Sequence, residues 1–322
     1  MRKVTLFITL LLSFLIFPVN ARQKDYDFKV VGYYSLRSAM NDFGRFPFKR
    51  LTHVNLFFLN PDTLGNFTQD LSPLQNFISK AHRKNVKVLF SIAGGGEHPY
   101  YHKLLQDSNR FGFIQNLISQ VIRYDFDGID VDLEGSDIDE NYEVFVSELS
   151  RELKIRHKLI TSAIAVYYKE DLSDTALAQY DFVNIMCYDR TGPWRPEVHG
   201  QHSSFKDAED DLTYFGIERN IPPERMILGV PFYGYGFGPG ISSPVKTMSY
   251  NKIVSEFPDS ETADQWVLDD GKIMYYNGIP TIRQKTVLAK EKASGIMMWQ
   301  LGGDTRGSKS LLKVIYKTAH VK

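Results

Sequence analysis

Acidic and apolar residues alternate in the stretch 126–134, which reads FDGIDVDLE. Asp130, Asp132 and Glu134 carry carboxyl groups, and an apolar residue precedes each of them. Side chains of a β-strand alternate between two faces, so this pattern places the three carboxyl groups on one face, roughly 7 Å apart. The stretch therefore predicts a strand with one acidic and one apolar face.

Carboxyl groups at this spacing have a particular chemistry when they are buried. Like charges inside a packed barrel cannot all ionise, so at least one proton stays bound near neutral pH. A carboxylic acid that keeps its proton can act as a general acid. A solvated edge strand and a cation-binding site are the alternative interpretations, and the specificity of the stretch favours acid–base chemistry over both.

Apolar runs that could position this strand recur along the whole chain. They predict eight strands, at residues 30–34, 54–58, 86–91, 126–134, 159–166, 182–188, 226–232 and 295–299. Helical periodicity fills the connections, most clearly at residues 72–84, from 110 onward, 142–153 and 311–318. Eight strands joined by right-handed crossovers predict one (β/α)8 barrel, an α/β fold. A doubly wound open sheet is the competitor, but the first strand lacks its glycine-rich phosphate turn.

Candidate site residues fall where strands end. In a (β/α)8 barrel the carboxyl ends of the strands line the active site, and Glu134, Tyr188 and Trp299 all lie at such ends. These three residues are far apart in the sequence, so their common position is the strongest sign that they form one site.

The acidic stretch is also the basis of a family resemblance. With Asp127, Asp130, Asp132 and Glu134 it resembles the D-x-x-D-x-D-x-E signature of the family 18 glycoside hydrolases, the chitinases and their relatives. The resemblance extends over essentially the whole chain after the first 21 residues through further motifs in the expected order. They are S-x-G-G at 91–96 with Ala93 in place of a glycine, M-x-Y-D at 186–189, G-x-W at 192–194, and the segments 229–234 and 295–299.

The resemblance implies a role for each site residue. Glu134 would protonate the glycosidic oxygen, Asp132 would orient the substrate's acetamido group, and Asp130 would share a proton with Asp132. Tyr188 would hold the acetamido oxygen. The implied substrate-binding residues are Trp299 as the floor under the sugar, with Tyr33, Asp189 and Trp194 as walls. The reaction is retaining, with the substrate's own acetamido group as nucleophile, and it needs neither a metal nor an organic cofactor.

Glycines and a serine next to the acidic strand have a supporting role. The glycines at 94–96 let the backbone approach the acidic strand closely, and Ser91 could hydrogen-bond Asp130, the innermost aspartate. Cys187 is the only cysteine, so no internal disulfide can form, and we interpret it as a buried bystander.

The longest connection between predicted strands spans residues 235–294. It predicts a helix at 250–257, a hairpin at 267–275 that turns on Asp270-Gly271, and a helix from Thr281. Family members with deep clefts carry a larger α+β insertion at this point. By resemblance, the reduced insertion predicts a shallower, more open cleft that favours internal cuts.

The first residues predict export. Met1-Arg2-Lys3 and an apolar run to Val19 end in a small-residue cleavage site near Ala21, which is typical of a signal peptide rather than of a transmembrane helix. We therefore predict a signal peptide at 1–21 and the catalytic barrel at 22–322, exported to the periplasm or the exterior. Without residues 1–21 the chain has 36 basic and 38 acidic residues, a net charge of −2. This balance excludes a basic surface built to bind nucleic acid or an anionic membrane.

Three functions remain open at this point. The first is hydrolysis of β-1,4-linked N-acetylglucosamine in chitin or its oligomers by a monomeric enzyme. The second is an endo-β-N-acetylglucosaminidase acting on N-glycans, or a peptidoglycan-active relative, which the match at 186–189 disfavours. The third is a chitin-binding lectin without activity, which the presence of all three carboxyl groups disfavours.

Overall fold

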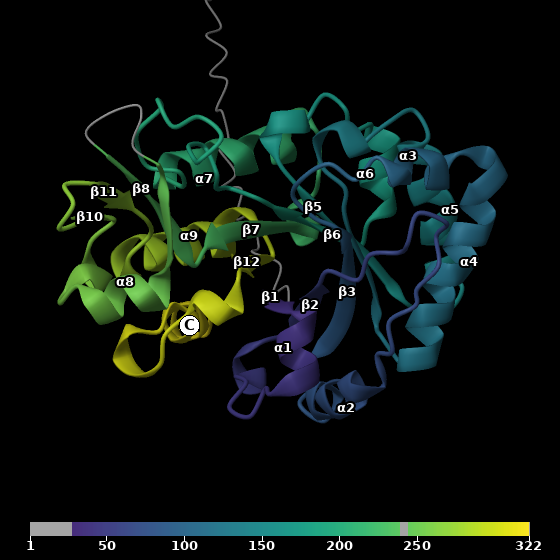
Figure 1. Ribbon diagram of the computed structural model, residues 1–322, viewed down its shortest axis with the longest axis horizontal. Coiled ribbons are helices and arrows are strands. Elements are labelled where there is room, and N and C mark those ends of the chain that lie inside the picture. Colours follow the sequence, from purple (N-terminus) through teal and green to yellow (C-terminus); the bar gives the residue numbers. More distant parts are fainter. Residues whose placement is uncertain (1–27, 239–243, 322) are drawn as a thin grey trace, which may run out of the picture.

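Parallel strands close into a barrel in the computed structural model, which describes residues 28–238 and 244–321 (Figure 1). The barrel strands are β1 Lys29–Ser35, β2 His53–Phe57, β3 Lys87–Ala93, β4 Gly128–Asp132, β5 Leu159–Ile164, β6 Phe182–Ile185, β7 Met226–Pro231 and β12 Gly295–Trp299. Their order around the ring is β1-β12-β7-β6-β5-β4-β3-β2. The predicted (β/α)8 barrel is confirmed.

Helices cover the outside of this ring. They are α1 Leu36–Asn41, α2 Gln75–His82, α3 Tyr100–Leu105, α4 Asp107–Tyr124, α5 Tyr142–Lys154, α6 Asp174–Gln179, α7 Phe205–Thr213, α9 Ile279–Lys292 and α10 Leu311–Ala319, with α8 in the insertion described below. The predicted apolar stripe of α5 is buried along its length, from Tyr142 to Leu153. Helix α7 begins with a capping box, in which Ser204 and Asp207 satisfy each other's backbone N–H groups. The predicted helices are confirmed to within a few residues of their ends.

Strands β4, β5 and β6 are shorter than predicted. We expected them to end at residues 134, 166 and 188, but they end at Asp132, Ile164 and Ile185. The ladder between β6 and β7 pairs only residues 183–185 with 226–228, so the chain after Ile185 has no strand partner there. Glu134 and Tyr188 consequently lie beyond the strands, on backbone that is set by loop contacts.

The insertion after β7 forms a small antiparallel sheet of its own. Its strands are β8 Tyr233–Phe237, β9 Lys246–Ser249, β10 Gln265–Val267 and β11 Ile273–Tyr275, in the order β10-β11-β8-β9. Helix α8, Tyr250–Glu256, lies next to it, and both are at the left of Figure 1, opposite α4 and α5. The predicted helix and hairpin are confirmed, and Gly271 has the positive φ of 78° that its turn requires.

Strands β8 and β9 were not predicted. Strand β8 reads YGYGF, and glycine disfavours strands, so the stretch gave no strand signal. The structure supplies the reason for one glycine: a Cβ at Gly234 would lie 2.3 Å from the carbonyl oxygen of Tyr275 on the neighbouring strand. The close approach of two backbones explains a residue that propensity alone places outside a strand.

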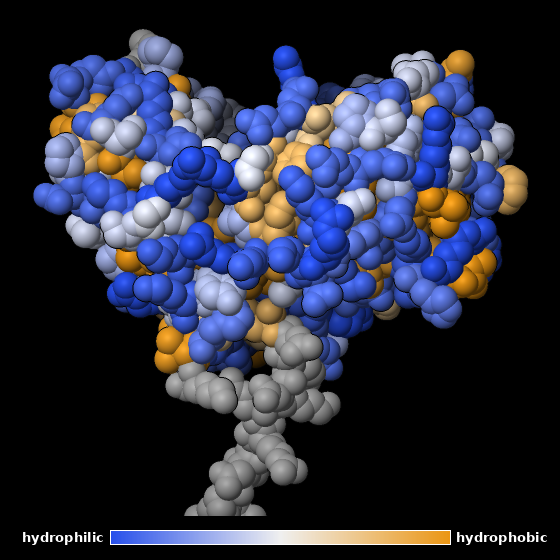
Figure 2. All heavy atoms as spheres, turned by 90° about the horizontal axis from the view of Figure 1, so that it is seen from below, coloured by the Kyte–Doolittle hydropathy of each residue, from blue (hydrophilic) through white to orange (hydrophobic). Residues whose placement is uncertain are grey.

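Hydrophilic side chains dominate the face that carries α1, α2 and α10. Figure 2 shows this face, on which hydrophobic side chains form a band near the middle and smaller areas toward the edges. Within residues 28–238 and 244–321, none of the helices has the length and apolar character needed to cross a membrane. The predicted signal peptide at 1–21 lies outside the described residues.

Candidate active site

Asp130 lies at the base of the site, inside the barrel. Its carboxyl group accepts hydrogen bonds from the Tyr33 hydroxyl at 2.7 Å, from Thr161 Oγ1 at 2.6 Å and from Asn184 Nδ2 at 3.3 Å. Ser91 Oγ donates another, which confirms the predicted contact. Burial raises the pKa of Asp130, and the hydrogen bonds oppose that rise. Side chains from four other barrel strands, β1, β3, β5 and β6, thus hold this carboxyl group in place.

Asp132 is the next inward residue on β4 and is 2 % exposed. Its Oδ1 atom is buried and has no hydrogen-bond partner among the described residues. Burial raises its pKa well above the usual range, and the charges of Glu134 and Asp130 raise it further. Leaving a buried hydrogen-bond acceptor without a donor costs free energy. This oxygen is therefore suited to accept a hydrogen bond from an N–H group of a bound ligand.

Glu134 lies two residues beyond the end of β4, on extended backbone with φ −127° and ψ 148°. Burial raises the pKa of its carboxyl group to about 7, with further contributions from the charges of Asp189 and Asp137. Across the described part of the chain, no side chain donates a hydrogen bond that would favour the ionised form. The proton therefore remains on Glu134 up to neutrality, as general acid catalysis requires.

The loop after β6 faces Glu134 from the other side. Tyr188 is 3 % exposed, and burial raises the pKa of its phenol well above 10, with Asp189 and Asp132 adding to the rise. The hydroxyl therefore stays protonated and can donate a hydrogen bond. Asp189 has a left-handed backbone, with φ 64°, and its Oδ1 accepts the Tyr233 hydroxyl at 2.5 Å. His202 Nδ1 lies 3.4 Å from the same oxygen.

Aromatic rings border these carboxyl groups. Trp299, the last residue of β12, packs 5.3 Å from the Tyr33 ring and 4.7 Å from the Phe57 ring. Trp194 is 54 % exposed and lies 5.9 Å from the ring of Tyr235, on β8. Trp299 and Trp194 therefore present apolar faces at different depths, one partly buried and one at the rim.

The sequence-predicted residues differ in their access to a ligand. Tyr33 is 1 % exposed and its hydroxyl is used on Asp130, so it lies beneath the site and supports it. Asp189 is partly exposed, with 32 % of its side chain accessible. The structure therefore places Asp189, Trp194 and Trp299 where a ligand could touch them, and it places Tyr33 behind them.

Several residues at the site had no role in the sequence-based prediction. Thr161 and Asn184 occupy inward positions on β5 and β6, and the same alternation that located Asp130 would have located them. Tyr233 and His202 reach Asp189 from β8 and from the loop before α7, and no local pattern indicates this. Asn55 on β2 is fully buried, and neither amide atom has a partner among the described residues.

Ala93 ends β3 in a left-handed conformation, with φ 66°. Non-glycine residues rarely adopt this region, which accounts for the glycine that the family motif has here. In this chain Asn60 holds the alanine: its Oδ1 accepts from the Ala93 N–H at 2.6 Å, and its Nδ2 donates to the Ala93 carbonyl at 3.0 Å. Next to it, the Gly94 N–H donates to the Asp132 carbonyl at 3.0 Å, so backbone does approach the acidic strand closely.

Other concavities and clusters carry no comparable chemistry. A cavity of about 840 Å³ lies between the chain after α1 and the chain before α10, and its lining includes Arg45, Arg50 and Arg306 but none of the carboxyl groups above. Within the described ranges, no three His, Cys, Asp or Glu side chains are grouped as metal ligands would be. The acidic strand and its surroundings are therefore the candidate active site.

Comparison with known proteins agrees with this chemistry. The family model described as glycosyl hydrolases family 18 matches residues 29–304. The chain belongs to glycosyl hydrolase family 18. The match includes every barrel strand and every site residue described above, so the fold and the family are established together.

Relatives in this family include chitinases from bacteria and plants. The crystal structure of a family 18 chitinase from the chitin utilization locus of Flavobacterium johnsoniae is 35% identical, with a TM-score of 0.81 over 91% of this chain and 94% of that one. A chitinase from Bacteroides thetaiotaomicron is 26% identical, with a TM-score of 0.75 over 91% of this chain and 96% of that one. A class V chitinase from Medicago truncatula is 26% identical over 313 residues, or 79% of this chain and 80% of that protein.

Proposed function

We propose that this glycoside hydrolase cleaves β-1,4-linked N-acetylglucosamine in chitin or chitooligosaccharides, with retention and with assistance from the substrate. The proposal rests on the different states of two neighbouring carboxyl groups. Glu134 keeps its proton near neutrality, and Asp132 offers a buried oxygen without a hydrogen-bond partner among the described residues. One group can donate a proton while the other accepts an N–H, which are the two functions that this chemistry needs. The similarity to chitinases supports the choice of substrate.

The first step breaks the glycosidic bond. Glu134 gives its proton to the glycosidic oxygen, and the acetamido carbonyl oxygen attacks the anomeric carbon as the leaving sugar departs. Asp132 accepts a hydrogen bond from the acetamido N–H and stabilises the positive charge of the resulting oxazolinium ion. The Tyr188 hydroxyl donates to the acetamido oxygen and fixes its direction of attack, and Trp299 packs against the sugar ring.

The second step restores both the sugar and the enzyme. The ionised Glu134 accepts a proton from a water molecule, whose oxygen attacks the anomeric carbon from the side that the leaving group vacated. The oxazoline ring opens, the acetamido group is regenerated, and the product has the β configuration of the substrate. Two inversions at one carbon give net retention.

The proposal extends to the organisation of the protein. Residues 1–21 would be a signal peptide and residues 22–322 the catalytic barrel, with export as the consequence. We expect the barrel to act as a monomer on accessible chains. Size-exclusion chromatography and amino-terminal sequencing of the exported protein test both points.

The decisive experiment compares wild type with Glu134→Gln and with Glu140→Gln, an exposed glutamate outside the site. Chromogenic chitotriose substrates and an N-glycosylated protein are the two probes. We expect wild type and Glu140→Gln to cleave the chitin oligomer and Glu134→Gln to lose at least about 10³-fold in rate.

Other outcomes would redirect the assignment. Deglycosylation alone would make the protein an endo-β-N-acetylglucosaminidase, and binding without turnover by wild type would make it a lectin. Proton NMR of the initial product tests retention, for which the β anomer must appear first. Oligomers of glucosamine without acetyl groups test the substrate's role as nucleophile, and their cleavage at comparable rates would contradict it.

A further inference from the structure

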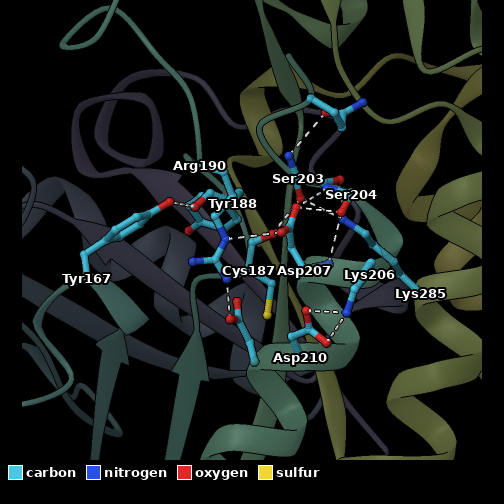
Figure 3. Close-up of polar contacts among 12 residues, drawn as sticks. Tyr167, Cys187, Tyr188, Arg190, Ser203, Ser204, Lys206, Asp207, Asp210 and Lys285 are labelled. Carbon is cyan, nitrogen blue, oxygen red and sulfur yellow. Dashed lines mark hydrogen bonds and ion pairs between the residues drawn. The ribbon is translucent and has the colours of Figure 1, made fainter. Parts of the chain in front are cut away.

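A lysine is fully buried behind the active-site loop. Lys285, on α9, has no exposed surface, and its ammonium group donates to Ser203 Oγ at 2.7 Å and to the Ser203 carbonyl at 2.8 Å (Figure 3). It also donates to Asn277 Oδ1 at 2.8 Å. An ammonium group has three N–H donors, and all three are used. No carboxylate among the described residues forms an ion pair with it. A buried charge with no direct counter-ion is expensive to keep, which calls for a role.

The hydrogen bonds of Lys285 continue to the active-site loop. Ser203 Oγ, which accepts from the lysine, donates its own proton to the carbonyl oxygen of Cys187 at 2.6 Å. Cys187 directly precedes Tyr188 and Asp189 in the loop after β6. Asn277 Nδ2 donates to the Ser203 carbonyl at 2.8 Å and closes the network from the insertion side. The ammonium group is thus two hydrogen bonds away from the backbone that carries two site residues.

The loop has little support from the barrel strands: its Met186 N–H donates to the Ile164 carbonyl of β5 at 2.8 Å, and the ladder to β7 stops before it. Strand β6 ends at Ile185, and Asp189 has a left-handed backbone with φ 64°. His202, which directly precedes Ser203, contacts Asp189. His202 and Ser203 therefore both contact the loop after β6. The charge of Asp189 is in turn a contributor to the raised pKa of Glu134. The position of the loop therefore affects both the acetamido contact and the acid.

We infer that Lys285 is a positioning residue that holds the loop of Tyr188 and Asp189 against the substrate through Ser203. This inference rests on the proposed glycoside hydrolysis and adds a residue outside the cleft to it. The charged form is required, because a neutral amine has two donors and can make only two of the three hydrogen bonds.

Titration of the lysine should then affect turnover. Burial lowers the pKa of Lys285 to about 8, so the third hydrogen bond is lost above that pH. The groups that face the ammonium from the surrounding elements are Cys187 after β6, His202, Asp207 and Asp211 on α7, and Asp264 before α9. Their net effect leaves the lysine charged at neutrality, where the enzyme would work.

A double-mutant cycle with Lys285→Met and Ser203→Ala tests the inference. We expect each single variant to lower kcat on chromogenic chitotriose about 10-fold, because a small misplacement of Tyr188 is costly to catalysis, while KM changes less than about twofold. The double variant should also lose about 10-fold rather than about 100-fold, because the two residues act through one chain of hydrogen bonds. Lys292→Met, an exposed lysine at the end of the same helix, is the control and should behave as wild type.

A pH profile separates positioning from stability. In wild type, log kcat should fall with a slope steeper than one above pH 8, where Glu134 and Lys285 are both deprotonated, whereas in Lys285→Met the slope should remain one. Additive losses in the double variant, unchanged kcat in a folded Lys285→Met, or an unchanged slope would overturn the inference.

Hydrogen exchange keeps the test independent of activity. Peptides that cover residues 186–191 should exchange faster in Lys285→Met and Ser203→Ala than in wild type and Lys292→Met. This measurement stands even if wild type cleaves no chitotriose, an outcome that would refute the proposed function alone. Should Lys285→Met fail to fold, Ser203→Ala, which removes a single hydroxyl, still decides the matter, and unchanged exchange in it would refute the positioning role.

Discussion

Asp130 and Glu134, at the base and at the mouth of the acidic stretch, carry the same functional group in different surroundings. At the base, Asp130 is fully buried and accepts hydrogen bonds from four side chains. At the mouth, Glu134 is only half-buried and receives no hydrogen bond from any side chain of the described residues. Burial raises the pKa of both, but hydrogen bonds oppose the rise at Asp130 alone.

This difference separates a structural carboxyl group from a reactive one. Donors around Asp130 favour a fixed geometry and limit its proton affinity. The absence of donors around Glu134 leaves its proton free to be transferred. Asp132 stands between them, buried like Asp130 yet without a partner for Oδ1 like Glu134. The following substitutions either break or sharpen this distinction, from the largest expected effect to the smallest.

Asp132→Asn should have the largest effect of the changes described below. Removal of the charge that faces the developing oxazolinium ion should lower kcat by about 10³-fold, equivalent to about 4 kcal/mol. The rate is measured on chromogenic chitotriose at pH 6, with the exposed Asp171→Asn as control. A loss confined to KM would show that Asp132 binds the substrate without acting in the transition state.

Glu134→Gln should stabilise the protein at high pH. Burial raises the pKa of Glu134 from 4.5 to about 7, so ionisation of this group costs the folded protein stability. Its contribution to the free energy of unfolding is full below pH 4.5 and is lost as the pH rises to about 7. Glutamine cannot ionise, and at pH 8 the variant should gain about 3 kcal/mol in free energy of unfolding. Urea denaturation at pH 4 and pH 8 measures the gain, which must vanish at pH 4.

Asp130→Asn should destabilise the protein at both of these pH values. The amide places a donor where a carboxylate oxygen accepted hydroxyl hydrogens, which should cost about 2 kcal/mol in free energy of unfolding. Urea denaturation at pH 4 and pH 8 is the measurement. An unchanged midpoint would mean that the hydroxyl groups of Ser91 and Thr161 reorient without cost, and that the base of the strand is less constrained than its contacts indicate.

Asp189→Asn should move the alkaline limb of the pH profile of kcat/KM. The charge of Asp189 raises the pKa of Glu134, so its removal should lower that pKa and shift the limb to lower pH by about half a unit. Asp137→Asn should shift it in the same direction by less, because its charge contributes less. A shift to higher pH in either variant would contradict the assignment of the limb to Glu134.

The fold was largely predictable from the sequence because its signals are local. Eight apolar runs each identified a barrel strand, and six helical stripes each identified a helix. The ends of β4, β5 and β6 were placed too late, because strand propensity continues past the point where the neighbouring strand stops. Strand β8 was missed, because its glycines are explained only by the backbone opposite them.

The site residues that are charged and regularly spaced could be predicted from the sequence. Alternation along one strand indicated Asp130, Asp132 and Glu134, and the structure places them together. Tyr233 and His202 act on Asp189 across 44 and 13 residues of chain, and no periodic signal connects such positions. Tyr33 shows a further limit: its strand was predicted, but the direction of its hydroxyl depends on β4.

Strand β8 begins two residues after β7 ends, so the wall that carries Tyr233 and Tyr235 is a direct continuation of the barrel. Phe232, between the two strands, donates its N–H to the Trp299 carbonyl at 2.7 Å and accepts from the Tyr250 N–H at 2.9 Å. The junction is thus tied to β12 through its N–H group and to α8 through its carbonyl group. We therefore expect the segment that carries Tyr233 and Tyr235 to move with the barrel during substrate binding rather than as a separate lid.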